Sequence, residues 1–228
     1  QAVVVIKNGK IISEKYADGY DKNSHGTSWS MAKSYYAALI GISIDRGEIG
    51  GLDDKVSDYL SYFNDERSEI TIRDLLDMSS GLDFPKDEHE TMFFQEDHLK
   101  YAMGVGVEKS AGLKFEYNNV NSMLLGDILI ATSGKKADVL LKERILDLIG
   151  VTDYKLWKDE SGNVLTYCCV DMSARDYSKI GLLFSRNGNW DGKQLISKQY
   201  IDETFQVVWD VTPERFTTLK RGYSLHWW

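Results

Sequence analysis

The most continuous apolar stretch of the chain covers residues 34–44 and reads Ser-Tyr-Tyr-Ala-Ala-Leu-Ile-Gly-Ile-Ser-Ile. As a helix, it would carry too little polar surface to face water, so the pattern predicts a buried helix. A polar, turn-like segment precedes the stretch, and Ser28 or Ser30 would cap the helix. Glycines that follow Arg46 would end it. The pattern therefore places one helix in the core of the protein.

Strand patterns stand at both ends of the chain. Residues 2–6 and 10–16 are rich in β-formers and are joined by Asn8-Gly9, a strong signal for a two-residue hairpin. Residues 222–228 form another apparent strand. Strands at both ends and helices in the middle predict the α+β type of the α/β class, with a sheet lobe and a large helical insertion.

Helical periodicity dominates the middle of the chain. Residues 83–116 are the exception, since they mix aromatic and polar residues without a clear period and are expected to form loops with short helices. A short amphipathic segment is expected within 52–63. The further helices are predicted at 72–78, at 121–133, from Lys136 to Gly150, at 176–186 and at 197–205.

Composition narrows the classes of partner. The formal net charge of -8 over 228 residues argues against nucleic acid or an anionic membrane as the main partner. Asp45 and Arg46 interrupt the best apolar run, so no segment reaches the roughly 18–20 residues of a membrane span. Cys168 and Cys169 are adjacent, which indicates neither a disulfide framework nor a metal site, and they are expected to pack as small hydrophobes. The oligomeric state is left open.

Other aromatic and imidazole side chains receive structural interpretations. His25, His89, His98 and His226 have no mutual metal spacing, so structural or surface roles are expected. Trp29 is expected in the core, with the lining of an acyl pocket as the alternative. The aromatic cluster of Phe93, Phe94 and Tyr101 is also expected in the core, with the lining of a binding cleft as the alternative. Both ends of the chain look trimmed, so a periplasmic and a cytoplasmic location stay open.

The start of the apolar helix carries candidate chemistry. In Ser30-Met-Ala-Lys33, a spacing of three residues puts the Ser30 hydroxyl and the Lys33 amine on one helix face. Desolvation favours an uncharged amine, and an uncharged amine beside a hydroxyl is a base beside a nucleophile. The alternative is a helix cap followed by a solvated lysine. The first interpretation predicts a serine hydrolase.

A second candidate element is Phe115-Glu-Tyr117-Asn118-Asn119, in a polar break before a helix. A phenol and a carboxamide two residues apart on an extended loop project to the same side. Such a pair can relay a proton and hold a carbonyl substrate by hydrogen bonds. The alternative is an Asn-rich turn with a tyrosine in the core.

Together these residues resemble the serine β-lactamase and penicillin-binding protein superfamily, in its class C-like and esterase-like branch. Further segments fall in the order and spacing of that family: Gly51-Leu-Asp-Asp-Lys-Val56, Thr71-Ile-Arg-Asp-Leu-Leu76, Ser79-Ser-Gly-Leu82, Leu125-Gly126, Ser133-Gly-Lys135, Ser173-Ala-Arg-Asp-Tyr177 and the turn at 188–196. The resemblance implies one β-lactamase-like domain over 1–228, an antiparallel sheet flanked by helices. Its sheet lobe would comprise about 1–28 and 171–228, and its mostly helical lobe about 29–170.

The resemblance also implies roles for four residues. Ser30 would be the acylated nucleophile and Lys33 the base that takes its proton. Tyr117 would be the second general base and acid, and Asn119 would orient Lys33 and the substrate. The Ser30 N–H would contribute to the oxyanion hole together with an N–H from a sheet strand. No cofactor and no metal are expected.

One family motif is absent from the sequence, the Lys-Thr-Gly-like or His-x-Gly-like triplet on a sheet strand. The strand at 222–228 resembles the one that comes just before that triplet. The sequence is therefore expected to stop short of it, and the second oxyanion donor is unassigned. The function implied is hydrolysis of a small-molecule ester or amide through an acyl-enzyme. The candidate activities are esterase, small-amide or D-peptide hydrolase and β-lactam hydrolase, with esterase or small-amide hydrolase ranked ahead of true β-lactamase because the fold hosts all of these. A catalytically silent binding or sensor domain, or a structural partner completed by another chain, are the alternatives.

Overall fold

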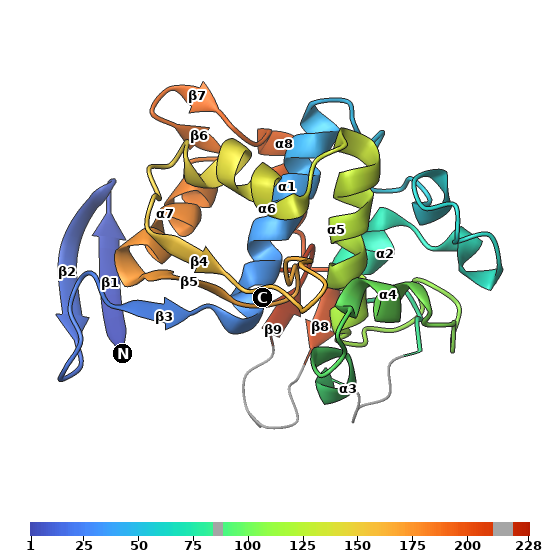
Figure 1. The fold of residues 1–228 in the computed structure, drawn as a ribbon. Coiled ribbons are helices and arrows are strands. Elements are labelled where there is room, and N and C mark those ends of the chain that lie inside the picture. The colour runs from blue at the N-terminus through green and yellow to red at the C-terminus, as the bar shows by residue number, and fades with distance from the viewer. Residues whose placement is uncertain (84–88, 212–220) are drawn as a thin grey trace.

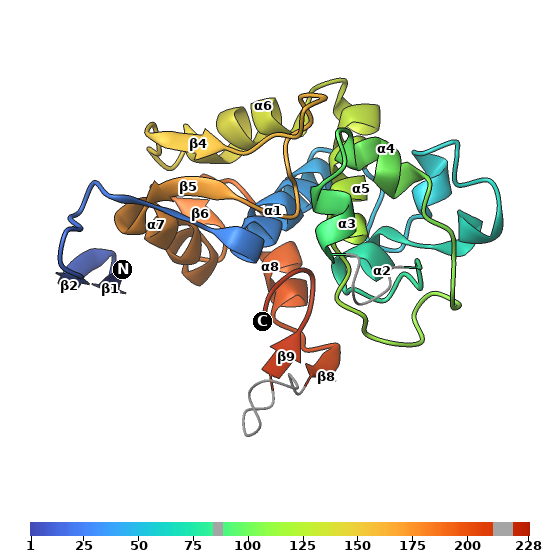
Figure 2. The same ribbon diagram turned by 60° about the horizontal axis from the view of Figure 1, so that its bottom comes forward.

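A computed structural model describes residues 1–83, 89–211 and 221–228 of the protein. Helix α1 (Ala32–Asp45) runs through the middle of the molecule, and other helices surround it (Figures 1 and 2). Every residue from Ala32 to Ser43 is buried, which confirms the predicted core helix. A 3₁₀ turn, η1 (Trp29–Met31), leads into α1 and carries Ser30.

The helices that follow α1 in sequence pack around it. Helices α5 (Asn119–Ser133) and α6 (Ala137–Leu141) contact α1 directly, and α6 continues into a π-helical turn, η5 (Lys142–Leu146). Tyr200 of α8 (Lys198–Thr204) donates from its hydroxyl to the Ala37 carbonyl of α1 at 2.7 Å. The central helix is thereby enclosed by elements that are distant in sequence.

A second group of helices lies on the outer side of α5. Helices α2 (Ile72–Leu76) and α4 (His98–Met103) contact α5, and α3 (His89–Phe93) packs on α4. Thr71 and Asp74 form a capping box at the start of α2, which satisfies two of its free N–H groups. The predicted amphipathic segment at 52–63 forms only the 3₁₀ turn η2 (Val56–Asp58), and η3 (Glu66–Glu69) follows it.

The strands form small antiparallel sheets. Strand β5 (Val170–Ser173) lies between β3 (His25–Thr27) and β4 (Tyr154–Leu156). The predicted hairpin is confirmed as β1 (Ala2–Lys7) and β2 (Lys10–Tyr16), with positive φ at the two turn residues, and it lies to the left of β3 and β5 in Figure 1. Helix α7 (Ala174–Ser185) packs on β1. Mixed helices and antiparallel sheets confirm the predicted α+β class.

The remaining strands form two antiparallel pairs: β6 (Asn189–Trp190) with β7 (Lys193–Gln194), and β8 (Trp209–Val211) with β9 (Arg221–Tyr223).

The predicted strand at 222–228 is wrong beyond its first residues, which belong to β9. After β9, Leu225 and His226 have φ values of 42° and 63°, which no strand accommodates. Their N–H groups donate to Asp77 Oδ1 at 2.8 Å and to the Leu76 carbonyl at 2.9 Å. These tertiary hydrogen bonds turn the segment onto the end of α2.

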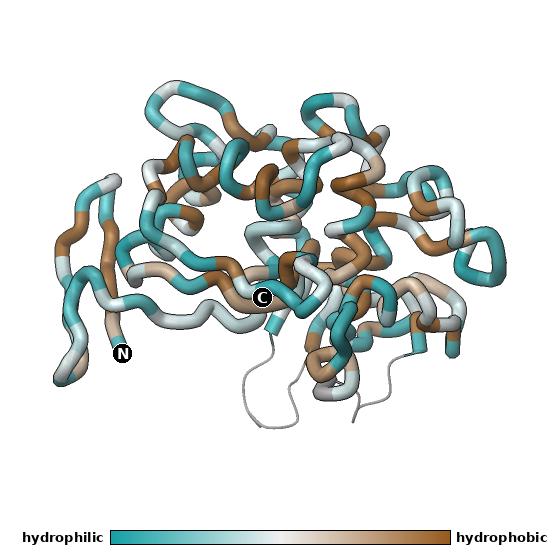
Figure 3. The backbone as a smooth tube through the Cα atoms, viewed as in Figure 1, coloured by the Kyte–Doolittle hydropathy of each residue, from teal (hydrophilic) through white to brown (hydrophobic). Residues whose placement is uncertain are grey.

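Hydropathy follows this arrangement. In Figure 3 the outer loops are largely hydrophilic, whereas apolar residues gather in the helices of the middle. None of the helices in the described ranges is both long and apolar enough to cross a membrane.

The expected core position of the aromatic cluster holds only in part, because Phe93 and Tyr101 pack on the core while the Phe94 side chain is exposed.

Candidate active site

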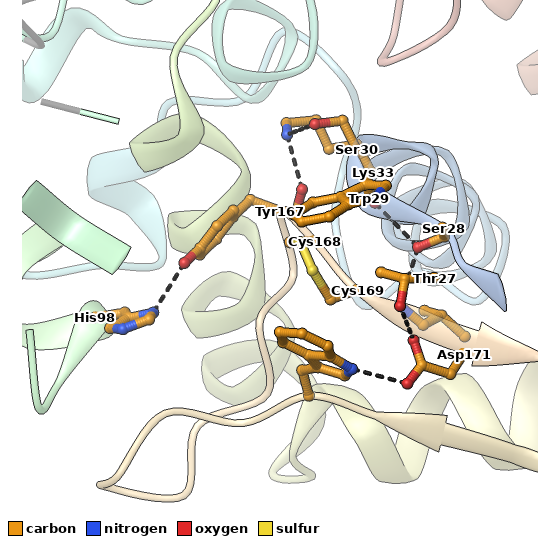
Figure 4. The surroundings of a disulfide bond; sticks show 12 residues. Thr27, Ser28, Trp29, Ser30, Lys33, His98, Tyr167, Cys168, Cys169 and Asp171 are labelled. Carbon is orange, nitrogen blue, oxygen red and sulfur yellow. Dashed lines mark hydrogen bonds between the residues drawn. A yellow bond between two sulfur atoms is a disulfide. The ribbon is translucent and has the colours of Figure 1, made fainter. Parts of the chain in front are cut away.

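The structure brings Ser30 and Lys33 together at the start of the central helix. Lys33 Nζ lies 3.1 Å from Ser30 Oγ and donates to the main-chain carbonyl of Tyr167 at 2.7 Å (Figure 4). Ser30 is exposed, whereas the Lys33 side chain is only 1% exposed. A surface hydroxyl therefore contacts an amine that solvent does not reach.

Burial controls the charge of this amine. It holds the pKa of Lys33 well below the usual range, because the charged form would lose its hydration. The neighbours of Nζ are largely aromatic: the ring centroid of Tyr117 lies 4.8 Å away and that of Tyr167 lies 5.8 Å away. His226 is also buried, and burial lowers its pKa to about 3. The site therefore favours uncharged partners for an uncharged amine.

Tyr117 completes the group around the Ser30 hydroxyl. Burial raises the pKa of the Tyr117 phenol, and its hydrogen bond with Ser30 partly offsets this rise. The Tyr117 ring stacks on Trp228, with centroids 6.0 Å apart and an interplanar angle of 25°, and meets Tyr223 edge-on at 6.4 Å. These rings fix the orientation of the phenol. The phenol is thus held, in its neutral form, beside the candidate nucleophile.

Asn119 lies on a different element from the serine and the lysine. It is the first residue of α5, two positions after Tyr117, and its side-chain oxygen is inaccessible to solvent. Asn118, which caps the helix, accepts from the Val120 N–H at 2.8 Å and sets the start of α5 two residues earlier than predicted. The cap therefore fixes the main chain that carries both Tyr117 and Asn119.

The turn that holds Ser30 is tied to strand β5. The Ser28 N–H donates to the Val170 carbonyl at 2.9 Å, and the Val170 N–H donates to Ser28 Oγ at 2.9 Å. The Cys169 N–H donates to the Trp29 carbonyl at 3.3 Å. These bonds join the residues on either side of the nucleophile turn to the chain that follows Tyr167. The same hydrogen bonds therefore position both Ser30 and the segment of Tyr167, whose carbonyl accepts from Lys33.

Cys168 and Cys169 are buried, as predicted, but their sulfur atoms form a disulfide that the sequence analysis does not anticipate (Figure 4). Adjacent cysteines fall outside the spacings from which disulfide frameworks are predicted, so this bond has no signal in the sequence. The bridge lies directly after Tyr167, at the site itself.

Trp29 departs from the prediction that it packs in the core. Its side chain is 64% exposed, and its φ of 48° is in the left-handed region. This backbone conformation turns the indole outward next to Ser30. The alternative, a position beside an acyl pocket, agrees with this placement.

One further residue, Tyr167, contacts the site without a signal in the sequence. Tyr167 supplies the carbonyl that accepts from Lys33, and its hydroxyl lies 3.0 Å from Nδ1 of His98. A main-chain carbonyl leaves no sequence signal, because every residue carries one. The expectation of structural roles holds for His98 and His226, which are buried within hydrogen-bonded networks. In the described ranges, no group of three or more His, Cys, Asp or Glu residues could hold a metal ion.

Small antiparallel sheets, helices packed around a buried central helix, and a Ser-x-x-Lys sequence at its start define the class of β-lactamase-fold proteins. The family model described as Beta-lactamase matches residues 1–228, and the chain belongs to this family. The resemblance inferred from the sequence is thereby confirmed.

Individual relatives agree with this assignment. N-acetylmuramyl-L-alanine amidase of Bacillus subtilis (strain 168) is 27% identical over 173 residues, which is 63% of this chain and 39% of that protein. A Bacillus anthracis structure described as a 6-aminohexanoate-dimer hydrolase aligns with a TM-score of 0.84 at 21% identity, over 100% of this chain and 64% of that one. EstCE1, described as a hydrolase with promiscuous acyltransferase activity, aligns with a TM-score of 0.80 at 15% identity, over 99% and 76%. The two structures establish the fold, and the chain spans less than half of the curated relative.

Proposed function

We propose that the protein is a serine hydrolase that forms an acyl-enzyme at Ser30. The observation that carries the proposal is the distance of 3.1 Å between Lys33 Nζ and Ser30 Oγ, combined with the burial of Lys33. An uncharged amine has a lone pair that can accept the Ser30 proton, and burial favours this uncharged form. Membership of the beta-lactamase family supports the proposal.

In the acylation step, the Ser30 hydroxyl loses its proton to Lys33 while Oγ attacks the carbonyl carbon of the substrate. The negative charge that develops on the substrate oxygen would be stabilised by the Ser30 N–H, with a strand N–H as the second donor. The proton then reaches the leaving group through Lys33 or the phenol of Tyr117, and the bond to the leaving group breaks. Water subsequently hydrolyses the Ser30 ester by the reverse proton transfers.

Tyr117 and Asn119 have different roles in this proposal. The Tyr117 phenol hydrogen-bonds Ser30, so it can pass a proton between the serine and the leaving group. Because the pKa of Tyr117 is raised, the phenol would act as a donor before it acts as a base. Asn119 would orient Lys33 and the substrate carbonyl through its amide group. Proton transfers in this cluster would be coupled, so a measured pKa belongs to the group as a whole.

Esters and small amides are the proposed substrates, ahead of β-lactams, with D-amino-acid peptides as a further candidate class. The description of one structural neighbour names a 6-aminohexanoate dimer, which is an amide, and another is called a hydrolase with acyltransferase activity. Both descriptions support acyl transfer from an open-chain carbonyl. The exposed indole of Trp29 beside Ser30 offers an apolar surface for the acyl group.

Covalent labelling tests the proposal. The full-length protein is incubated with a fluorophosphonate and, separately, with a fluorescent penicillin, and its intact mass is measured. One adduct that maps to Ser30 is expected with at least one reagent. Ser30→Ala should remove both the adduct and turnover while the thermal unfolding temperature stays nearly unchanged.

Ser185→Ala is the matched control, because Ser185 is an exposed helical serine whose hydroxyl bonds only to the Leu182 carbonyl in the described structure. This variant should be labelled like the wild type. Turnover that persists in Ser30→Ala would refute the assignment of the nucleophile. A folded wild type that neither reagent labels would favour a binding or sensor domain on the same scaffold.

A further inference from the structure

The Tyr167 side chain lies between the candidate base and a buried histidine. Its hydroxyl is 3.0 Å from His98 Nδ1, and both residues are 3% exposed. Nε2 of His98 lies 3.1 Å from the Phe93 carbonyl, which can only accept, so Nε2 carries the hydrogen. With the hydrogen on Nε2, Nδ1 accepts from the Tyr167 hydroxyl. The phenol is thus anchored to α4 by a fully satisfied hydrogen bond.

The main chain of the same tyrosine faces the site. The Tyr167 carbonyl accepts from Lys33 Nζ at 2.7 Å, a shorter distance than the 3.1 Å between Nζ and Ser30 Oγ. An uncharged amine has two N–H donors and one lone pair. When one N–H is directed to a carbonyl, which cannot donate, the lone pair is left to point elsewhere. With Ser30 Oγ at 3.1 Å, the carbonyl of Tyr167 helps to aim that lone pair at the serine proton.

We propose that Tyr167, anchored through its phenol on His98, is a positioning residue that orients Lys33 and keeps water from its amine. This proposal rests on the proposed function. The Tyr167 ring, at 5.8 Å from Nζ, covers one side of the amine, and Tyr117, at 4.8 Å, covers another. The hydrogen bond to His98 fixes how the Tyr167 ring lies (Figure 4).

Within the described residues, no carboxylate opposes the effect of burial on the Lys33 pKa. Burial is the cause that lowers the Lys33 pKa, and the titratable groups that face the amine are the phenols of Tyr117 and Tyr167 and the ring of His226. His226 Nε2 lies 2.9 Å from Ser122 Oγ, and this contact does not involve His98. Water admitted by a loosened Tyr167 would solvate the ammonium form and raise the Lys33 pKa.

Tyr167→Phe tests the proposal, because it removes only the hydroxyl and keeps the ring and the carbonyl. The rate of Ser30 acylation by the fluorophosphonate is measured against pH for the full-length protein. We expect the maximal rate to fall by about 5- to 10-fold, as one lost hydrogen bond of modest strength would produce. The acidic limb of the profile should move to higher pH by about half a unit or more, because the Lys33 pKa rises.

A second variant, His98→Leu, breaks the same hydrogen bond from the other side and should move the acidic limb in the same direction. Tyr62→Phe is the matched control, since the Tyr62 hydroxyl donates to Asp127 Oδ2 at 2.7 Å, a hydrogen bond that does not involve Lys33, Tyr167 or His98. Its unfolding temperature should fall, but its pH profile should coincide with that of the wild type.

The outcomes separate this inference from the proposed function. Labelling of Ser30 with an unchanged pH profile in both Tyr167→Phe and His98→Leu would overturn the positioning role alone, whatever happens to their unfolding temperatures. A wild type that is not labelled at Ser30 would overturn the proposed function and this inference with it.

Discussion

Ser30 in η1 and Lys33 at the start of α1 meet two different chemical requirements. The hydroxyl must meet a substrate and is exposed, whereas the amine must stay uncharged and is buried. Each demand is met by the local environment rather than by an opposite charge, because burial alone lowers the Lys33 pKa. This division has a cost in folding free energy, since a buried lysine gives up its proton or its hydration.

Lys33→Met should therefore abolish acylation and stabilise the fold. The acylation rate should fall by about 10²- to 10⁴-fold, the usual contribution of a general base. The free energy of unfolding at pH 7, measured with urea, should rise by about 1 kcal/mol, as at other functional sites relieved of a buried polar group.

The stability gained in Lys33→Met should depend on pH. Lys33 has a lowered pKa in the folded protein, so between that pKa and ~10.4 the unfolded chain binds more protons, and wild-type stability rises with pH. The advantage of Lys33→Met should shrink as the pH approaches ~10.4. A gain that stays constant over this range would contradict the burial of a neutral amine.

How far the site could be predicted depends on how local its residues are. Ser30 and Lys33 lie three positions apart where η1 leads into α1, so their contact follows from helical spacing. The contact of Tyr117 with Ser30 joins two helix starts far apart in the sequence, and only the family resemblance indicated it. Tyr167 acts through its carbonyl, which carries no residue-specific signal, and its partner His98 was interpreted as structural. The roles given to the catalytic residues stay predictions.

At the scale of elements, glycine decides how closely α1 and α8 approach. A Cβ added at Gly41 would lie 2.5 Å from Cδ1 of Tyr200, whose hydroxyl bonds to α1. The absence of a side chain thus lets the aromatic ring pack directly on the main chain of the central helix. No such contact exists at Gly181 of α7, where an added Cβ meets nothing within 4 Å.

Substitution of these two helical glycines by alanine should have opposite effects. Gly41→Ala should lower the free energy of unfolding by about 1–3 kcal/mol, because the methyl group overpacks against Tyr200. Gly181→Ala should raise it by about 1 kcal/mol, because alanine is the better helix former at an exposed position. Urea unfolding of both variants measures the difference, and a stabilised Gly41→Ala would contradict the close packing of α1 and α8.

Elements specified by local pattern agree with the prediction, and those specified by distant contacts do not. The Asn8-Gly9 hairpin and the helices α5, α7 and α8 follow from turn chemistry and periodicity. The segment after Tyr223 has the alternation of a strand, but hydrogen bonds from its N–H groups to Leu76 and Asp77 turn it away. The division of the domain into a sheet lobe and a helical lobe stays a prediction.

At the scale of the whole molecule, Asp77 joins three parts of the structure. It follows α2, accepts the N–H of Leu225 near the end of the described chain, and senses Arg73 and Glu203 electrostatically. Burial raises its pKa to about 6, which the hydrogen bond from Leu225 and the Arg73 charge only partly oppose. At neutral pH the ionised Asp77 side chain therefore lowers the free energy of unfolding.

Asp77→Asn should stabilise the protein above pH 6. In the wild type, the folded state binds more protons than the unfolded state between about pH 4 and pH 6, so stability falls as the pH rises through this range. The amide keeps an oxygen to accept from Leu225 and has no charge, so the free energy of unfolding at pH 7 should rise by about 2 kcal/mol.

Unfolding by urea at a series of pH values measures this change. The slope between pH 4 and pH 6 should become smaller in Asp77→Asn than in the wild type. Asp18→Asn, at an exposed position outside the core, is the control that should keep the wild-type slope. An Asp77→Asn profile parallel to that of the wild type would refute the raised pKa.

The burial of Lys33 has a further consequence, in the chemical labelling of the molecule. Only an uncharged amine attacks acylating reagents, and near neutrality the solvated lysines of the surface are almost all charged. Lys33 is the reverse case: its lowered pKa supplies the reactive form, while its 1% exposure keeps reagents away. Reagents for lysine would therefore mark the surface slowly and leave Lys33 unmarked, until unfolding removes its cover and returns it to the ordinary charged population.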